Sequence, residues 1–160
     1  GKYRRGKNVV HTTRFTQDLV NKTIDADHLQ AYFDTMTLVN VPGFSTHKMV
    51  TDTHGNAWII EPGRGVSFFA LKPGESLVLT NTPFFEIPVS ECGRAELVRS
   101  MLEKNQPTSS DDCFKILNQV KQSSVEWRTE FSMVYDHQEH CVHWCENQSF
   151  DTLHRYDFTE

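Results

Sequence analysis

The densest group of chemically reactive side chains in this sequence lies near its C-terminal end. Imidazole and thiol groups, which are ligands that zinc prefers, crowd into the nine residues from His137 to Cys145. In an extended strand His137 and Cys145 would stand about 26 Å apart, because each residue advances the chain by about 3.3 Å. The whole group therefore cannot converge on one ion. A pair such as Cys141 with His143 can at most join a metal site completed elsewhere, and we expect ordinary strand residues here.

The remaining histidines and glycines form no pattern typical of catalysis. His11, His47 and His54 have neither a partner at helical spacing nor a flanking acidic motif, so we expect ordinary surface or core roles for them. Gly63-Arg64-Gly65 opens no helix, unlike a phosphate-binding loop, and the sequence has no Gly-x-Ser-x-Gly nucleophile elbow. We therefore expect no metal and no cofactor.

Strands and turns dominate the first half of the chain. A short β-prone stretch from Val9 to Phe15 precedes a helix expected from about Ile24 to Thr35. Turn residues then separate four apolar stretches, which predict four antiparallel strands in sequence. These stretches are His47–Asp52, Ala57–Ile60, Val66–Leu71 and Ser76–Thr80.

The second half begins with two helices and ends in strands. Apolar spacing predicts a helix from Glu91 to Lys104, and Ser109–Asp112 caps a second helix that runs to about Gln122. Three short strand candidates follow, Phe131–Asp136, Cys141–Cys145 and Thr152–Phe158. The order of helix, β-meander, helix pair and β-meander predicts the α+β class, with antiparallel meander sheets and helices packed on them.

Length and charge narrow the function further. We expect a single domain over residues 1–160, since the length is near that of one ordinary domain. The net charge of -5, with 21 acidic against 16 basic residues, argues against a nucleic-acid partner. The basic opening from Lys2 to Lys7 is a weak exception, which a solvated terminus explains as well as a phosphate-binding arm. No apolar run approaches the roughly 20 residues that span a bilayer, so we expect no membrane partner.

The cysteine content favours a reducing compartment. Four cysteines, Cys92, Cys113, Cys141 and Cys145, are too few for a disulfide-built scaffold of this length. No secretory signal is visible at the start of the sequence. Together these features lead us to expect a cytoplasmic protein with reduced thiols.

Several short motifs, in a fixed order, resemble the choloylglycine hydrolase family, which includes bile salt hydrolases and penicillin V acylases. The match consists of a hairpin over Lys48–Pro62 that ends in a glutamate, a Thr-Asn-x-Pro signature at Thr80–Pro83, a helix that bears Arg94, and a strand pair opening at Thr129–Tyr135. It extends from Ile24 to Phe158. The resemblance implies that the chain corresponds to the C-terminal half of an αββα sandwich of the N-terminal-nucleophile hydrolases.

One departure from the family pattern decides what the resemblance implies for activity. Family members attack an amide carbonyl with a cysteine at the mature N-terminus, whose own α-amino group acts as base. This sequence opens with Gly1 and has no cysteine before Cys92. We therefore expect part of a linear amide hydrolase, inactive alone and lacking the N-terminal nucleophile half. The alternative is a non-catalytic binding or assembly domain that retains the family sheet.

Two catalytic positions of the family can be matched in this sequence. Asn81 matches the asparagine whose amide holds the oxyanion, although Asn-x-Pro is also ordinary turn chemistry. Arg94 matches the arginine near the catalytic cysteine, where a fixed cation favours thiolate, although a solvated helix arginine explains it equally well. Arg99 lies about 500° further around the helix and suits that role less.

The apolar patterning predicts that the chain associates. Near-continuous apolar runs, such as Trp58–Ile60 and Phe68–Phe69, indicate strands that are buried on both faces. A half-domain would leave a sheet face uncovered, so we expect either a homodimer or association with the N-terminal half. The amide substrate, with an acyl group that the sequence does not specify, would bind only when that half is present.

Overall fold

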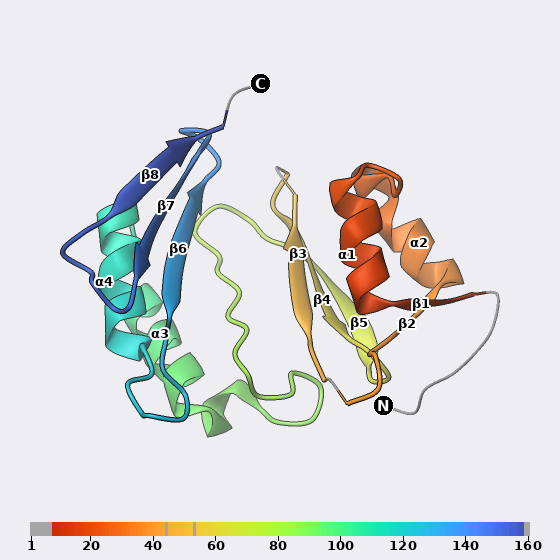
Figure 1. Ribbon diagram of the computed structural model, residues 1–160, viewed down its shortest axis with the longest axis horizontal. Helices are drawn as coiled ribbons and strands as arrows, with labels where there is room; N and C mark the ends of the chain where they lie inside the picture. Colours follow the sequence, from red (N-terminus) through yellow and green to blue (C-terminus); the bar gives the residue numbers. More distant parts are fainter. Residues whose placement is uncertain (1–7, 44, 53, 159–160) are drawn as a thin grey trace. The chain divides into compact units, whose positions relative to one another are not determined.

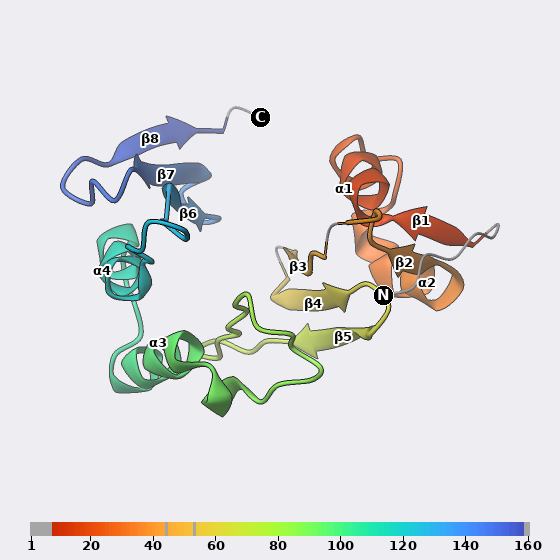
Figure 2. The same ribbon diagram turned by 60° about the horizontal axis from the view of Figure 1, so that its bottom comes forward.

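The computed structural model describes residues 8–43, 45–52 and 54–158. The basic opening from Lys2 to Lys7 lies outside these residues. Contacts divide the chain into two compact units, Gly1–Val89 and Ser90–Glu160, and each contains helices and a three-stranded antiparallel sheet (Figures 1 and 2). The α+β class is thereby confirmed, whereas the single domain and the αββα sandwich stay predictions. No helix in the described part of the chain is long and apolar enough to cross a membrane.

The first unit pairs a sheet with helices that lie on one of its faces (Figure 1). Strands β3, β4 and β5 form the antiparallel sheet in that order, and β1 pairs with β2 in parallel. Its elements are β1 (Val9–His11), α1 (Thr12–Val20), η1 (Ala26–His28), α2 (Leu29–Thr35), β2 (Thr37–Val39), β3 (Lys48–Thr51), β4 (Asn56–Glu61) and β5 (Gly65–Ala70).

The core of this unit lies between its helices and one face of the sheet. It consists of Phe15, Leu29, Leu38, Trp58 and Ile60, all buried. Because side chains alternate along a strand, Ala57 and Ile59 point to the opposite face, and they are buried as well. β4 is therefore buried on both faces, as its continuous apolar run predicts, but the same prediction is wrong for β5, where Phe68 is 49% exposed.

Helix α1 was not predicted. The stretch from Val9 to Phe15 was expected to be extended, but only β1 is, and the chain turns helical at Thr12. Thr12 and Phe15 are buried and Leu19 packs against the same core, at spacings of three and four residues. Burial of this helical face outweighs the preference of β-branched residues for strands.

The predicted fourth strand, Ser76–Thr80, is also wrong. The turn before it forms as expected, with the Glu75 amide donating to the Lys72 carbonyl at 2.9 Å and Gly74 at a φ of 84°. The residues that follow join no ladder in the described structure. An apolar run such as Leu77–Leu79 predicts burial, but a strand also requires a partner edge, which composition does not reveal.

The second unit follows its prediction closely. Ser109 caps α4, since its hydroxyl accepts a hydrogen bond from the Asp112 amide at 3.2 Å, and α4 packs against β6. The three strands form one antiparallel sheet in the order β6, β7, β8. The elements here are η2 (Val89–Glu91), α3 (Gly93–Lys104), α4 (Ser110–Val120), β6 (Phe131–Asp136), β7 (Cys141–Glu146) and β8 (His154–Asp157).

The turn between β3 and β4 is closed by polar contacts and by a glycine. The Asp52 carboxylate accepts hydrogen bonds from the amides of His54 and Asn56, both at 2.9 Å. Gly55 has a φ of +83°, and a Cβ added there would lie 2.8 Å from the Leu71 carbonyl oxygen. The Leu71 amide in turn donates to the Gly55 carbonyl at 2.9 Å, so the two backbones lie in direct contact.

We predict that Gly55→Ala destabilises the first unit more than Gly74→Ala does. Both glycines have positive φ, which costs an alanine about 1–2 kcal/mol, but Gly74 has no atom within 4 Å of the added carbon. Gly55→Ala must also displace the Leu71 backbone. Urea unfolding of the two variants measures the difference, and equal losses would contradict the close approach.

Candidate functional site

A polar cavity of about 350 Å³ lies in the first unit, where β4 ends. Its volume is within the range of small-molecule sites in proteins. Several of its side chains carry hydrogen-bonding or titratable groups. The lining residues are Ser45, Thr46, His47, Glu61, Arg64, Asn81 and Pro83.

The sheet register brings the central residues of this cavity together. Lys48 stands opposite Ile60 in the antiparallel β3–β4 pair, so one step further along the register places His47 opposite Glu61. Arg64 follows the turn that ends β4, in which its amide donates to the Glu61 carbonyl at 2.9 Å. Asn81 comes from the loop after β5.

Glu61 is the anchor of the site. Its side chain is 2% exposed, and its carboxylate accepts hydrogen bonds from the Phe84 amide at 2.6 Å and from the Phe85 amide at 3.1 Å. Burial by itself raises the pKa of Glu61, but these two amides and His47 together lower it below its ordinary value of 4.5. Glu61 is therefore an ionised carboxylate at neutral pH, and it holds the 83–85 loop against the end of the sheet.

The same carboxylate orients the imidazole of His47. Nδ1 of His47 lies 3.1 Å from Oε1 of Glu61, and the His47 side chain is 22% exposed. Because an ionised carboxylate only accepts hydrogen bonds, Nδ1 must carry the hydrogen. The other ring nitrogen, Nε2, is then left as an acceptor in the neutral ring. His47 was expected to have an ordinary role, and its pairing with Glu61 was missed.

Arg64 is held by an ion pair at the edge of the same cavity. Its Nε donates to Glu86 at 2.6 Å and its Nη2 donates to the second carboxylate oxygen at 3.2 Å. This two-point contact fixes the plane of the guanidinium. It also balances the charge of Arg64 locally, so the cavity is rich in hydrogen-bond donors without a net positive charge.

Asn81, the first residue predicted from the family resemblance, lies in this cavity with His47, Glu61 and Arg64. Its side chain is exposed and forms no hydrogen bond with the residues that the structure describes. The amide is thus available to donate to a bound molecule. Of the polar residues that line this cavity, only Asn81 was predicted from the sequence as a site residue.

Arg94, the second predicted site residue, belongs to the other unit. It lies in the first turn of α3, where it is half-buried, and Arg99 lies exposed on the same helix. Asn81 and Arg94 are therefore not brought together within either unit. The role expected for Arg94 stays a prediction.

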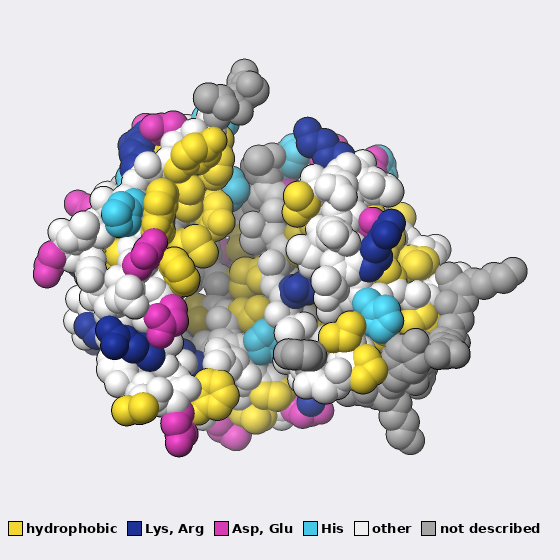
Figure 3. Space-filling model, viewed as in Figure 1, with side chains coloured by type: hydrophobic (Ala, Val, Ile, Leu, Met, Phe, Trp, Pro, Cys, Tyr) yellow, Lys and Arg dark blue, Asp and Glu magenta, His cyan; other side chains and the backbone are white. Residues whose placement is uncertain are grey.

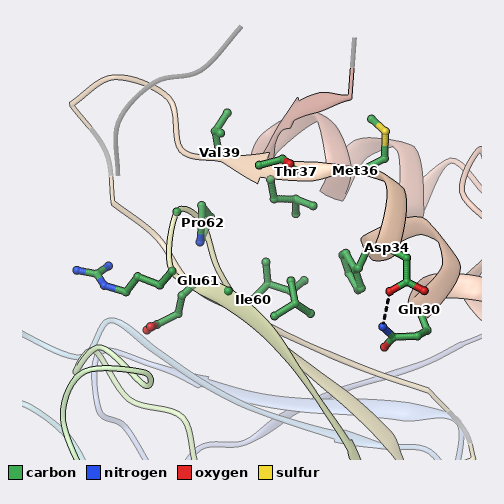
Figure 4. A pocket seen from close by; sticks show the side chains of 14 residues that line it. Gln30, Asp34, Met36, Thr37, Val39, Ile60, Glu61 and Pro62 are labelled. Carbon is green, nitrogen blue, oxygen red and sulfur yellow. Dashed lines mark hydrogen bonds between the residues drawn. The ribbon is translucent and has the colours of Figure 1, made fainter. Parts of the chain in front are cut away.

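A larger cavity of about 640 Å³ lies in the first unit, beside Glu61 and Arg64 (Figure 4). Val39 and Thr37 of β2 line it on one side and Ile60 of β4 on the other. At one end Gln30 donates to Asp34 at 3.0 Å, which leaves this acid with a partner inside its own helix. The larger cavity is lined by polar and apolar side chains alike, whereas the smaller one gathers His47, Glu61, Arg64 and Asn81 in less volume.

The cysteine and histidine cluster of β7 does not form a metal centre. Cys141 and His143 share one face of the strand, and Sγ lies 3.3 Å from Nε2. Within residues 8–43, 45–52 and 54–158, no three His, Cys, Asp or Glu side chains are arranged to hold an ion. Burial raises the pKa of the Cys113, Cys141 and Cys145 thiols, so none of these three is an activated nucleophile.

Comparison with known proteins does not test the family resemblance. The chain matches no family model, no curated protein and no solved structure. The resemblance to choloylglycine hydrolases therefore stays a prediction.

We predict that Glu61→Gln destabilises the first unit by about 1–3 kcal/mol at neutral pH. A glutamine has one acceptor oxygen for the Phe84 and Phe85 amides, and its own NH₂ group would face a donor. Urea unfolding at pH 7 measures the loss. The control, Glu86→Gln, removes an exposed ion pair worth at most about 1 kcal/mol.

Glu61→Gln, compared with the native chain, also tests how the stabilising effect of Glu61 depends on pH. The pKa of Glu61 is lower in the folded chain than its ordinary value of 4.5 in the unfolded one. Its stabilising contribution is therefore fully present at a pH above this ordinary value. This contribution is lost as the pH falls through the folded value. The gap in stability between the native chain and Glu61→Gln should therefore narrow in acid, and a constant gap from pH 7 to 3 would contradict the assignment.

Proposed function

We propose that this chain is part of a linear amide hydrolase of the N-terminal-nucleophile type, which supplies an oxyanion donor but not the nucleophile. The observation that carries the proposal is the position of Asn81 in a donor-rich cavity beside Glu61. The order of motifs that resembles the choloylglycine hydrolases and the α+β class support it.

In this proposal the Asn81 amide donates to the carbonyl oxygen of the substrate as negative charge develops on it. A neutral donor that is fixed in advance stabilises this charge without reorganisation during the reaction. The loop that follows Asn81 supplies the fixation, since Glu61 binds the backbone amides of Phe84 and Phe85. Glu61 thus acts as a positioning residue.

The nucleophile is proposed to come from a segment outside these 160 residues. Three of the four cysteines have a raised pKa because of burial, as described above. The fourth, Cys92, is the residue that precedes α3. Arg94 is proposed to favour the thiolate of the missing cysteine, and this role rests on the resemblance alone.

The alternative function is a non-catalytic binding or assembly domain. The larger cavity of about 640 Å³ favours it, because a cavity of this volume can bind a ligand without any chemistry. Substitution of Asn81 distinguishes the two functions, because the Asn81 amide takes part in turnover only if the chain belongs to a hydrolase.

We predict that the isolated chain is inactive towards amides, and that mixing with a separately expressed half carrying an N-terminal cysteine produces turnover. The measurement is release of glycine, taurine or phenoxyacetate from the corresponding amides. Release by the isolated chain would contradict a missing nucleophile. A mixed sample that binds but stays inactive would favour the assembly domain.

In the active mixture, Asn81→Ala should lower kcat by about 10²- to 10³-fold, the usual effect of removing one oxyanion donor. The matched control is Asn105→Ala, because Asn105 is an exposed asparagine that ends α3 in the other unit. It should leave kcat unchanged. An unchanged kcat in Asn81→Ala would mean that Asn81 only forms a turn before Pro83.

A further inference from the structure

The sheet of the second unit has two faces of different character. Residues that stand opposite each other in an antiparallel pair share a face, so Ser132 with Cys145 and Asp136 with Cys141 mark one of them. Ser132, Cys141 and Cys145 are buried. The alternate residues of the three strands mark the other face, which we call the aromatic face. It is formed by Phe131, Met133, Tyr135, Val142, Trp144, Glu146, His154 and Tyr156, with Phe158 just beyond β8.

The aromatic face is exposed although it is built from large apolar side chains. Five of its members are between 46% and 59% exposed, namely Phe131, Met133, Tyr135, Tyr156 and Phe158. In Figure 3 hydrophobic side chains gather over the β6–β8 sheet. With roughly 200 Å² for each large side chain, these five leave about 500 Å² of surface in water. That is near the upper limit for the largest patch on a monomer, about 300–600 Å².

Ring contacts within the face order its side chains. The rings of Tyr135 and Phe158 stack with centroids 6.3 Å apart and planes 5° apart, and Trp144 stacks on His154 at 5.3 Å. The Phe158 amide donates to the His140 carbonyl at 2.8 Å, which holds the chain beyond β8 against the sheet. Preordered aromatic side chains lose little entropy when a partner covers them.

The charges around the face decide what can cover it. Glu146 stands opposite Phe131 at one end, and no lysine or arginine belongs to the face in the described strands. A nucleic acid or an anionic membrane would require basic residues here. An apolar surface without like charges at its centre is instead compatible with a second copy of itself.

We propose that the aromatic face is the contact surface of a homodimer, in which the sheets of two copies pack face to face. The exposed apolar area of about 500 Å², extended by a polar rim, approaches the roughly 800 Å² per partner of a standard interface. Two such sheets pack about 10 Å apart with interdigitated side chains. The interface does not rest on the proposed hydrolase function.

Sedimentation equilibrium of the full chain tests the proposal, with concentrations up to about 100 µM so that a Kd near 1 µM is covered. The expected mass is twice the 18.5 kDa of one chain. Tyr135→Glu places a charge within the face and should shift the mass to that of a monomer. Val125→Glu is the matched control, because Val125 is fully exposed and lies between α4 and β6, outside the face. It should remain a dimer.

Circular dichroism and urea unfolding establish whether each variant is folded. If Tyr135→Glu unfolds, the milder Tyr135→Ser and Tyr156→Ser, on the two edge strands, should still weaken the dimer by at least about tenfold in Kd. A native chain that is monomeric at all concentrations would overturn the proposal. So would a dimer that all face variants leave intact. A native monomer that binds the N-terminal half, and loses this binding in Tyr135→Glu, would assign the face to that half instead.

Discussion

The candidate site depends on one buried negative charge, the carboxylate of Glu61. An ion removed from water must be matched by donors, and here the Phe84 and Phe85 amides and the His47 ring supply them. The two amides come from the 83–85 loop and the ring from the residue before β3, so satisfying this charge links the end of β4 to both segments. A hydrophobic residue at position 61 would offer no acceptor to these donors.

This constraint also explains how an irregular segment becomes ordered. Residues 76–80 join no ladder, yet the loop beyond them is fixed at one end of the sheet by hydrogen bonds to Glu61. Aromatic packing adds to the fixation, because the Phe84 ring lies against Phe69 with centroids 5.9 Å apart. The Phe85 ring lies over Gly65, 3.6 Å from the position that a Cβ would take there, which is an ordinary van der Waals separation. Asn81 thus enters the cavity from a loop that is held by a charge and two rings.

Local signals predicted most of the second unit and the turns of the first. Caps and turns depend on contacts between residues that are close in the sequence, such as the hydrogen bond from the Asp112 amide to Ser109. Such contacts can be read from the sequence itself. Helix α1 and the pairing of β1 with β2 were missed because burial against distant residues decides them. The contact between His47 and Glu61 is neither purely local nor hidden from the sequence. Both strands of that hairpin were predicted, and counting outwards from the turn would have set His47 opposite Glu61. The histidine was judged instead by helical spacing, which does not apply to strands.

In the two sheets, the periodicity of a strand and its residue types carry different information about burial. The continuous apolar run of β4 was taken as a sign that the chain needs a partner, but the chain itself buries both faces of that strand. β6 alternates between buried and more exposed positions, the pattern usually expected of a strand with one face in water. Its outward residues are Phe131, Met133 and Tyr135, for which water is a poor environment. Alternation therefore indicates which residues share the outward face, and only their apolar character indicates that this face should be covered.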